Sequence, residues 1–165
     1  MRNSAELIIA LKDELLIYLS NEKGAAFAQE FDELSAGKDL SDAWKQFAIW
    51  LLIDEQHGAI RFRNPYHGEY FMIKCVAQLY IDDCQDVDVW KAVWDAALDA
   101  DYKLPAAAAR AAWEPAYFDT TSAAVLSARA AWLVVRFAAD EMNDGHLQTM
   151  ADKLLELIKK SPEAT

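Results

Sequence analysis

The chain has 165 residues, of which 27 are acidic and 16 are basic, so its net charge at neutral pH is −11. Hydrophobic residues make up 54% of the sequence. This excludes intrinsic disorder, because disordered chains lack the apolar side chains that build a core. The acidic excess argues against direct binding to nucleic acid or to an anionic membrane, since both carry negative charge.

Turn-forming residues are scarce, with only 5 glycines and 4 prolines in the chain. All-β domains need many turns, and turns concentrate glycine and proline. The composition therefore predicts an all-α fold, and the length suits one domain. We predict a single-domain bundle of about seven to eight helices that spans residues 1–165.

Apolar residues with helical spacing, N-capping residues and helix breakers divide the chain into eight predicted helices. In the first, leucines recur at four-residue intervals from Leu7 to Leu19, so that one face is apolar. Pro115 is expected to end the sixth, because a proline ring clashes with the preceding helical turn. The helices are expected over residues 4–19, 24–34, 41–58, 64–83, 86–101, 105–114, 121–142 and 144–160.

Residues 59–63 alternate apolar and basic side chains, which is the spacing of an extended segment. The next helix is expected to begin at Asn64 and Pro65 and to carry Phe71 and Cys75 on its apolar side. Cys75 is therefore predicted to be a small core residue. The two cysteines of the chain cannot bridge across nine helical residues, about 13.5 Å, so we expect a reduced, cytoplasmic protein.

The C-terminal half contains a weak regularity. Trp94, Trp113 and Trp132 are spaced by nineteen residues, and the pentamer Ala-Arg-Ala-Ala-Trp ends at both Trp113 and Trp132. A repeat of one helix and one loop would give this spacing. Alanine-rich helices also generate such matches by chance, so a weak helical repeat and unrelated helices both stay open.

Residues 82–101 hold seven aspartates against one base, Lys91, and so carry a net charge of −6. Because helical residues advance by about 100° each, Asp88, Asp95 and Asp99 fall on one stripe of the fifth predicted helix, opposite Trp90. We expect the carboxylates in water and the tryptophans packed inside. The predicted partner-binding residues are Asp82, Asp83, Asp86, Asp88, Asp95 and Asp99.

Two interpretations of this acidic segment stay open. A localised row of carboxylates would speed the encounter with a basic protein surface and select its orientation, and it could imitate the phosphates of nucleic acid. Inhibitors of the immunity or anti-defence type would work in this way. The alternative is an ordinary solvated helix face, because charged runs commonly serve solubility alone.

Patterns typical of catalysis, metal binding or cofactor binding are missing from the sequence. The three histidines, His57, His67 and His146, lack the neighbours of zinc and di-iron motifs. Neither a Gly-x-Ser-x-Gly nucleophile motif nor a glycine-rich nucleotide loop occurs. We therefore predict a non-enzymatic protein that uses no catalytic residue, metal or cofactor.

Two basic features are secondary candidates. A loop with Arg61, Arg63 and Tyr66 suits an interface, where arginine and tyrosine are enriched, or is an ordinary connector. Arg129 and Arg136 lie on one line of a largely apolar predicted helix. Three interpretations stay open: the arginines bind a small anion, a partly buried Arg129 joins an internal salt-bridge network, or the two form a line of surface charge.

The aromatic content supports a further alternative. With 6 Trp, 6 Tyr and 7 Phe, the chain holds more aromatic side chains than one core need absorb, and exposed apolar patches mark interaction sites. Self-association into a helical homo-oligomer is therefore the second predicted function, beside binding to a basic protein.

Overall fold

The computed structural model describes residues 4–117, 123–141 and 145–165, and the regular structure of these ranges is helical. It consists of a short 3-10 helix, η1 (Ala59–Phe62), and the α-helices α1 (Ser4–Tyr18), α2 (Asn21–Ser35), α3 (Ala43–Ile53), α4 (Gly68–Ile81), α5 (Val87–Asp99), α6 (Lys103–Tyr117), α7 (Ala123–Glu141) and α8 (Gly145–Lys160). The predicted all-α class and the predicted number of helices are confirmed. The expected ends of the seventh helix and the expected start of the eighth, at residues 121, 142 and 144, lie outside the described ranges.

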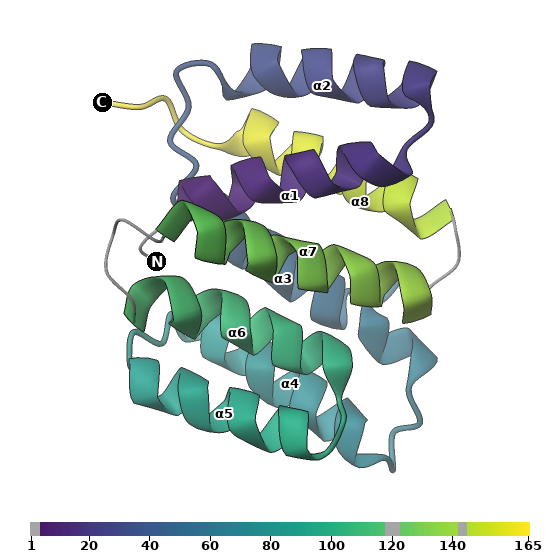
Figure 1. Cartoon of the computed structure of the whole chain (residues 1–165), viewed down its shortest axis with the longest axis vertical. Helices are drawn as coiled ribbons and strands as arrows, with labels where there is room; N and C mark the ends of the chain where they lie inside the picture. The colour runs from purple at the N-terminus through teal and green to yellow at the C-terminus, as the bar shows by residue number, and fades with distance from the viewer. Residues whose placement is uncertain (1–3, 118–122, 142–144) are drawn as a thin grey trace.

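The helices pack in two layers (Figure 1). One layer contains α5, α6, α7 and α1, in which each helix contacts the next, and the other contains α4, α3 and α8. Helix α2 covers α8 and α1 at one end of the molecule, and α5 lies at the opposite end. Helix α5 therefore has neighbours on one side only, α6 and α4, which leaves its outer face uncovered.

The core forms one cluster of buried apolar side chains to which every α-helix contributes. Its largest fully buried members include Trp44, Phe47 and Tyr80. The indole Nε1 of Trp44 donates to the Tyr80 hydroxyl at 3.0 Å, and that hydroxyl donates to the carbonyl of Ala108 at 2.7 Å. Burial raises the pKa of Tyr80 above its ordinary value, so the hydroxyl stays neutral and ties α3, α4 and α6 together.

Helix α6 is buried along most of its described side chains, residues 103–113. Its side chains from Leu104 to Ala109 are buried, as are Ala111, Ala112 and Trp113. Small alanine side chains let α4, α5 and α7 approach this helix closely. The predicted end before Pro115 is wrong, because α6 continues to Tyr117. Packing against the neighbouring helices outweighs the local cost of a proline in the last turn.

The connection between α3 and α4 differs from the prediction in two respects. The predicted extended segment 59–63 forms the 3-10 helix η1, and α4 begins at Gly68 rather than at Asn64. Asn64 forms a turn instead, in which its side chain accepts a hydrogen bond from the Tyr66 amide at 2.9 Å. His67 caps α4 by accepting from the Glu69 amide through Nδ1.

The predicted buried face of α4 is wrong. Phe71 is 61% exposed and Cys75 is also exposed, whereas the helix buries Ile73, Val76, Ala77 and Tyr80. Apolar residues occur on both sides of this helix, so periodicity alone favours neither side. The two hydrogen bonds of the Tyr80 hydroxyl orient the helix, because a buried tyrosine hydroxyl needs partners.

The three evenly spaced tryptophans lie one in each of α5, α6 and α7. Trp94 and Trp113 pack together with ring centroids 5.1 Å apart, whereas Trp132 is 38% exposed on α7. The nineteen-residue spacing therefore places the tryptophans in three successive helices, but their surroundings are not equivalent.

Candidate functional site

The seven aspartates of residues 82–101 all lie at the protein surface. We call them the acidic surface; they are Asp82, Asp83, Asp86, Asp88, Asp95, Asp99 and Asp101. On α5 the opposite face is packed inward, since Trp90 and Ala97 are buried and Trp94 is half-buried. The rings of Trp90 and Tyr80 lie 4.7 Å apart, and the Trp90 indole donates to the Cys84 carbonyl at 2.9 Å. This anchor turns the aspartate stripe outward.

Three members of the acidic surface also shape the ends of helices. Asp86 is the N-cap of α5, and its carboxylate accepts from the amides of Asp88 and Val89. Asp83 and Asp101 have φ angles of 51° and 59°, the left-handed conformation that closes a helix. Aspartate tolerates this conformation better than most residues do, so the helix ends can carry carboxylates where glycine is usual.

Few cations offset this charge. Lys91 pairs with Asp95 at 2.9 Å, and Lys45 lies 3.9 Å from Asp83 while pairing more closely with Asp42. Both pairs are at the surface, where such contacts contribute about 0–1 kcal/mol and are screened by salt. The Asp82 carboxylate also accepts from the Gln78 amide at 2.8 Å. Among the described residues, the carboxylates of Asp88, Asp99 and Asp101 have no hydrogen-bond or ion-pair partner and are left to water.

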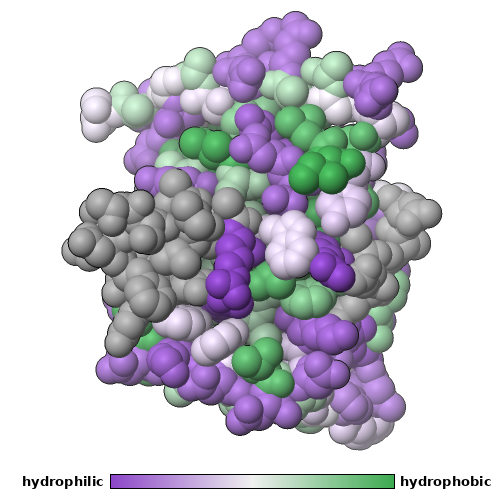
Figure 2. All heavy atoms as spheres, in the orientation of Figure 1, coloured by the Kyte–Doolittle hydropathy of each residue, from purple (hydrophilic) through white to green (hydrophobic). Residues whose placement is uncertain are grey.

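Exposed apolar side chains border the acidic surface, a feature that the sequence interpretation missed. Ile81, Val89 and Leu98 are all exposed, Leu98 by 55%. On the helical wheel, Val89 lies about 100° to one side of Asp88, and Leu98 lies about 100° to the other side of Asp99. Figure 2 shows hydrophilic residues along the edge of the molecule over α5, interrupted by hydrophobic ones. The wheel of α5 could have revealed these residues, because neither shares the Trp90 face.

The predicted contact loop does not present its three residues together. Tyr66 is 93% exposed and Arg61 is exposed, with its guanidinium over the Phe62 ring. Arg63 is largely buried, and its Nε lies 2.9 Å from a Glu69 carboxylate oxygen. The loop therefore exposes Arg61 and Tyr66 to solvent, while Arg63 holds the loop to α4.

Arg129 and Arg136 are both exposed on α7. The Arg136 guanidinium lies 5.1 Å from the centroid of the Trp132 ring. Arg129 is therefore not partly buried, and the two arginines lie at the surface of the bundle, as in the alternative of a line of surface charge. The side chain of Asp140, the expected partner of Arg136, lies outside the described residues.

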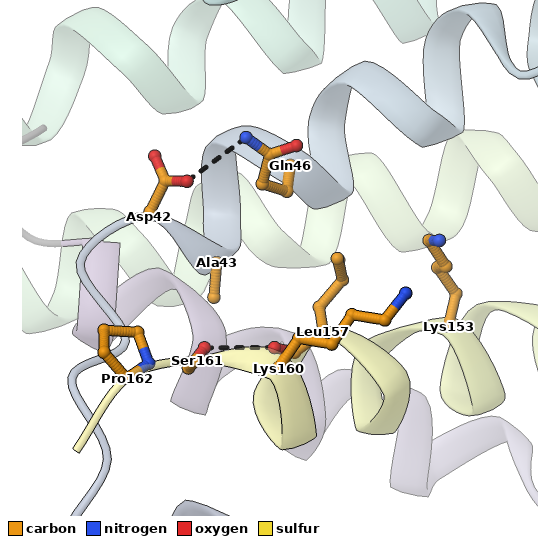
Figure 3. A pocket seen from close by; sticks show the side chains of 8 residues that line it. All are labelled: Asp42, Ala43, Gln46, Lys153, Leu157, Lys160, Ser161 and Pro162. Atoms are coloured by element: carbon orange, nitrogen blue, oxygen red, sulfur yellow. Dashed lines mark hydrogen bonds between the residues drawn. The ribbon is translucent and has the colours of Figure 1, made fainter.

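A shallow groove of about 390 Å³ runs between α3 and α8 (Figure 3). Its polar side chains already have partners. Gln46 donates to Asp42 at 3.1 Å, and Lys153 and Lys160 both pair with Glu156. These lysines hold the pKa of Glu156 below its ordinary value, Lys160 through the strongest hydrogen bond. The groove thus lacks a free group that would recognise a charged ligand.

Two histidines pack against Trp50 near this groove. The rings of His57 and His146 each lie 5.9 Å from the Trp50 ring, and His146 is stacked nearly parallel to it. His57 pairs with Asp54 at 3.3 Å. The Nε2 of His146 is buried without a hydrogen-bond partner among the described residues. Within those residues, no cluster of three metal-ligating side chains occurs.

His146 should make the fold sensitive to acid. Burial lowers the pKa of His146, and the nearby charges of His57 and Arg61 lower it further. The unfolded chain therefore binds a proton more readily than the folded chain, so stability falls as the pH drops below the ordinary histidine pKa of about 6.5. Urea unfolding of wild type between about pH 7 and pH 5 should show this loss.

A histidine substitution separates this effect from general acid sensitivity. His146→Phe keeps a ring on Trp50 and should reduce the loss of unfolding free energy at acidic pH. His67→Asn retains a capping side chain on α4 and should lose as much stability at acidic pH as wild type does. If wild type and His146→Phe lose stability in parallel, His146 is not the responsible group.

None of the described helices combines the length and the apolar composition needed to cross a bilayer. Comparison with known proteins does not identify relatives of this chain. No protein-family model matches it, and neither a curated protein nor a solved structure is similar enough to count as a match. A functional interpretation therefore rests on the chemistry of the acidic surface and its surroundings.

Proposed function

We propose that this protein is a non-catalytic binding domain that inhibits its partner by docking the acidic surface onto a basic protein surface. The observation that supports this most strongly is the row of exposed carboxylates on α5, with few offsetting cations and with Val89 and Leu98 at its borders. A solvated helix face needs the charges but has no need of the apolar border.

The arrangement has the two components of a protein interface. Charge complementarity accelerates encounter and fixes orientation, while apolar side chains supply contact area that water leaves on binding. Helix α5 lies at one end of the bundle and contacts α6 and α4 on one side only. A partner can therefore reach its outer face without displacing another element.

Inhibition follows from the kind of surface that such a domain would cover. Proteins that bind nucleic acid or anionic substrates do so through lysines and arginines. A helix that carries carboxylates binds the same basic side chains and thereby excludes the natural ligand. The proposed partner is a protein of this kind, and the carboxylates of the acidic surface stand in for phosphates.

The test compares two variants that change the net charge equally. Asp88→Lys/Asp95→Lys/Asp99→Lys reverses the α5 stripe, and Glu22→Lys/Glu30→Lys/Asp32→Lys reverses exposed acids on α2, at the other end of the molecule. Each form of the protein is used to capture proteins from the native cell. Candidate partners are those that bind wild type and the α2 variant but not the α5 variant, and these are purified. Their affinity is then measured against salt concentration.

We expect the affinity for the partner to fall steeply as the salt concentration rises. The α5 reversal should abolish binding, and bound wild-type protein should block the natural anionic ligand of the partner. Equal binding by wild type and the α5 variant, or equal losses in both variants, would show that the α5 stripe is not the docking surface. Helical content by circular dichroism confirms that each variant is folded.

A further inference from the structure

Helix α7 presents a basic aromatic ridge on a strongly acidic protein. We define the α7 ridge as Arg129, Trp132 and Arg136, which are all exposed. They are spaced by three and four residues, so they share one face of the helix, and the two arginines are about 10.5 Å apart along its axis. The Arg136 guanidinium lies over the Trp132 ring at 5.1 Å.

The ridge has the composition of a binding surface. Tryptophan and arginine are the residue types most enriched at the energetic centres of interfaces. Both flanking sides of α7 are occupied by α1 and α6, and the ridge points away from them, over the outer face of the layer. Among the side chains that the structure describes, no carboxylate lies within ion-pair distance of either guanidinium.

The acidic surface of the same chain carries the complementary pattern. Asp88 and Asp95 are seven residues apart on α5, so they have the same axial separation of about 10.5 Å as the two arginines. Ala92 lies exposed between them, and its small side chain leaves room for a large ring. Carboxylates on α5 thus match guanidiniums on α7 in sign and in spacing.

We propose that the α7 ridge binds α5 of a second copy of this chain. With the two helices antiparallel, one register brings all three pairs together: Arg129 with Asp95, Trp132 with Ala92, and Arg136 with Asp88. The pair of Lys91 and Asp95 within one copy is exposed and weak, so the arginine of the second copy replaces or shares it.

This contact joins two different surfaces, so it is heterologous. Heterologous contacts extend into chains or close into rings, whereas a two-fold dimer uses the same patch on both copies. Ion pairs at the rim and one tryptophan give a weak and salt-sensitive association. Self-association does not depend on the proposed inhibition, but both use α5, so a basic partner would compete with the second copy.

The test measures average mass by light scattering and sedimentation from micromolar to millimolar protein, at low and high salt. The average mass of the wild-type protein should rise above the monomer mass of 18.6 kDa as its concentration increases, and high salt should reverse this rise. The variants Arg129→Glu/Arg136→Glu and Asp88→Arg/Asp95→Arg should each stay monomeric. Mixing these two variants should restore association, because each then meets the opposite charge. Lys23→Glu/Lys159→Glu, which reverses exposed lysines elsewhere, should behave as wild type does.

A wild type that stays monomeric at every concentration overturns the proposal. So does association that survives both reversals, or a mixture of the two reversed variants that fails to associate. The ridge variant separates the two proposals, since Arg129→Glu/Arg136→Glu should lose self-association while keeping the partner-binding surface on α5 intact.

Discussion

Replacing Trp90 with alanine should lower the free energy of unfolding by about 3–5 kcal/mol, the usual cost of removing a buried aromatic side chain. Trp90 is 3% exposed, and its ring packs against Tyr80. The substitution leaves a cavity between α4 and α5, and it deprives the Cys84 carbonyl of its hydrogen bond from the indole. Helix α5 has few other neighbours, so the loss should loosen this end of the bundle.

Urea unfolding followed by circular dichroism measures this loss. Trp90→Phe should recover most of the packing but not the indole hydrogen bond, so its loss should be smaller. Trp132→Ala removes a tryptophan that is 38% exposed, so it should cost less than Trp90→Ala. A Trp90→Ala protein no less stable than Trp132→Ala would show that Trp90 does not anchor α5. The acidic surface would then need another support.

Tyr80→Phe should lower the free energy of unfolding by about 1–3 kcal/mol, although it removes one oxygen atom only. The hydroxyl accepts from Trp44 and donates to the Ala108 carbonyl. Without it, the buried indole N–H of Trp44 loses its partner, and an orphaned buried group costs about 1–3 kcal/mol. The Ala108 carbonyl loses only its second donor, because it also accepts the backbone hydrogen bond within α6. The effect of this substitution therefore comes mainly from the unpaired indole N–H on α3.

Denaturant unfolding of a double-mutant cycle tests this account. Trp44→Phe also breaks the first hydrogen bond, so the double variant should lose less than the sum of the two single losses. Tyr66→Phe, at a site exposed by 93%, is the matched control and should change stability by less than about 0.5 kcal/mol. Additive losses for Tyr80→Phe and Trp44→Phe would contradict a shared network.

Helix α5 illustrates what could be predicted from the sequence. Its tryptophans and aspartates separate cleanly on a helical wheel, so local periodicity is enough to direct Trp90 inward and Asp88, Asp95 and Asp99 outward. The apolar border at Val89 and Leu98 is present in the same pattern, since neither residue falls on the Trp90 face of the wheel.

Helix α4 and the connection before it illustrate the opposite case. Phe71 and Ile73 give α4 two apolar sides, and only the distant partners of Tyr80 decide which side is buried. The alternation in residues 59–63 suggested an extended segment, yet η1 forms there because the chain must turn between α3 and α4. Such outcomes depend on contacts between residues far apart in the sequence.

By itself, the sequence determined the all-α class, the approximate number of helices and the outward direction of the aspartates on α5, because each follows from composition or from the helical period. Only the tertiary structure decided the buried face of α4, the stacking of His146 on Trp50 and the uncovered ridge on α7. Burial depends on which helices become neighbours, and that choice minimises exposed apolar surface over the whole chain at once.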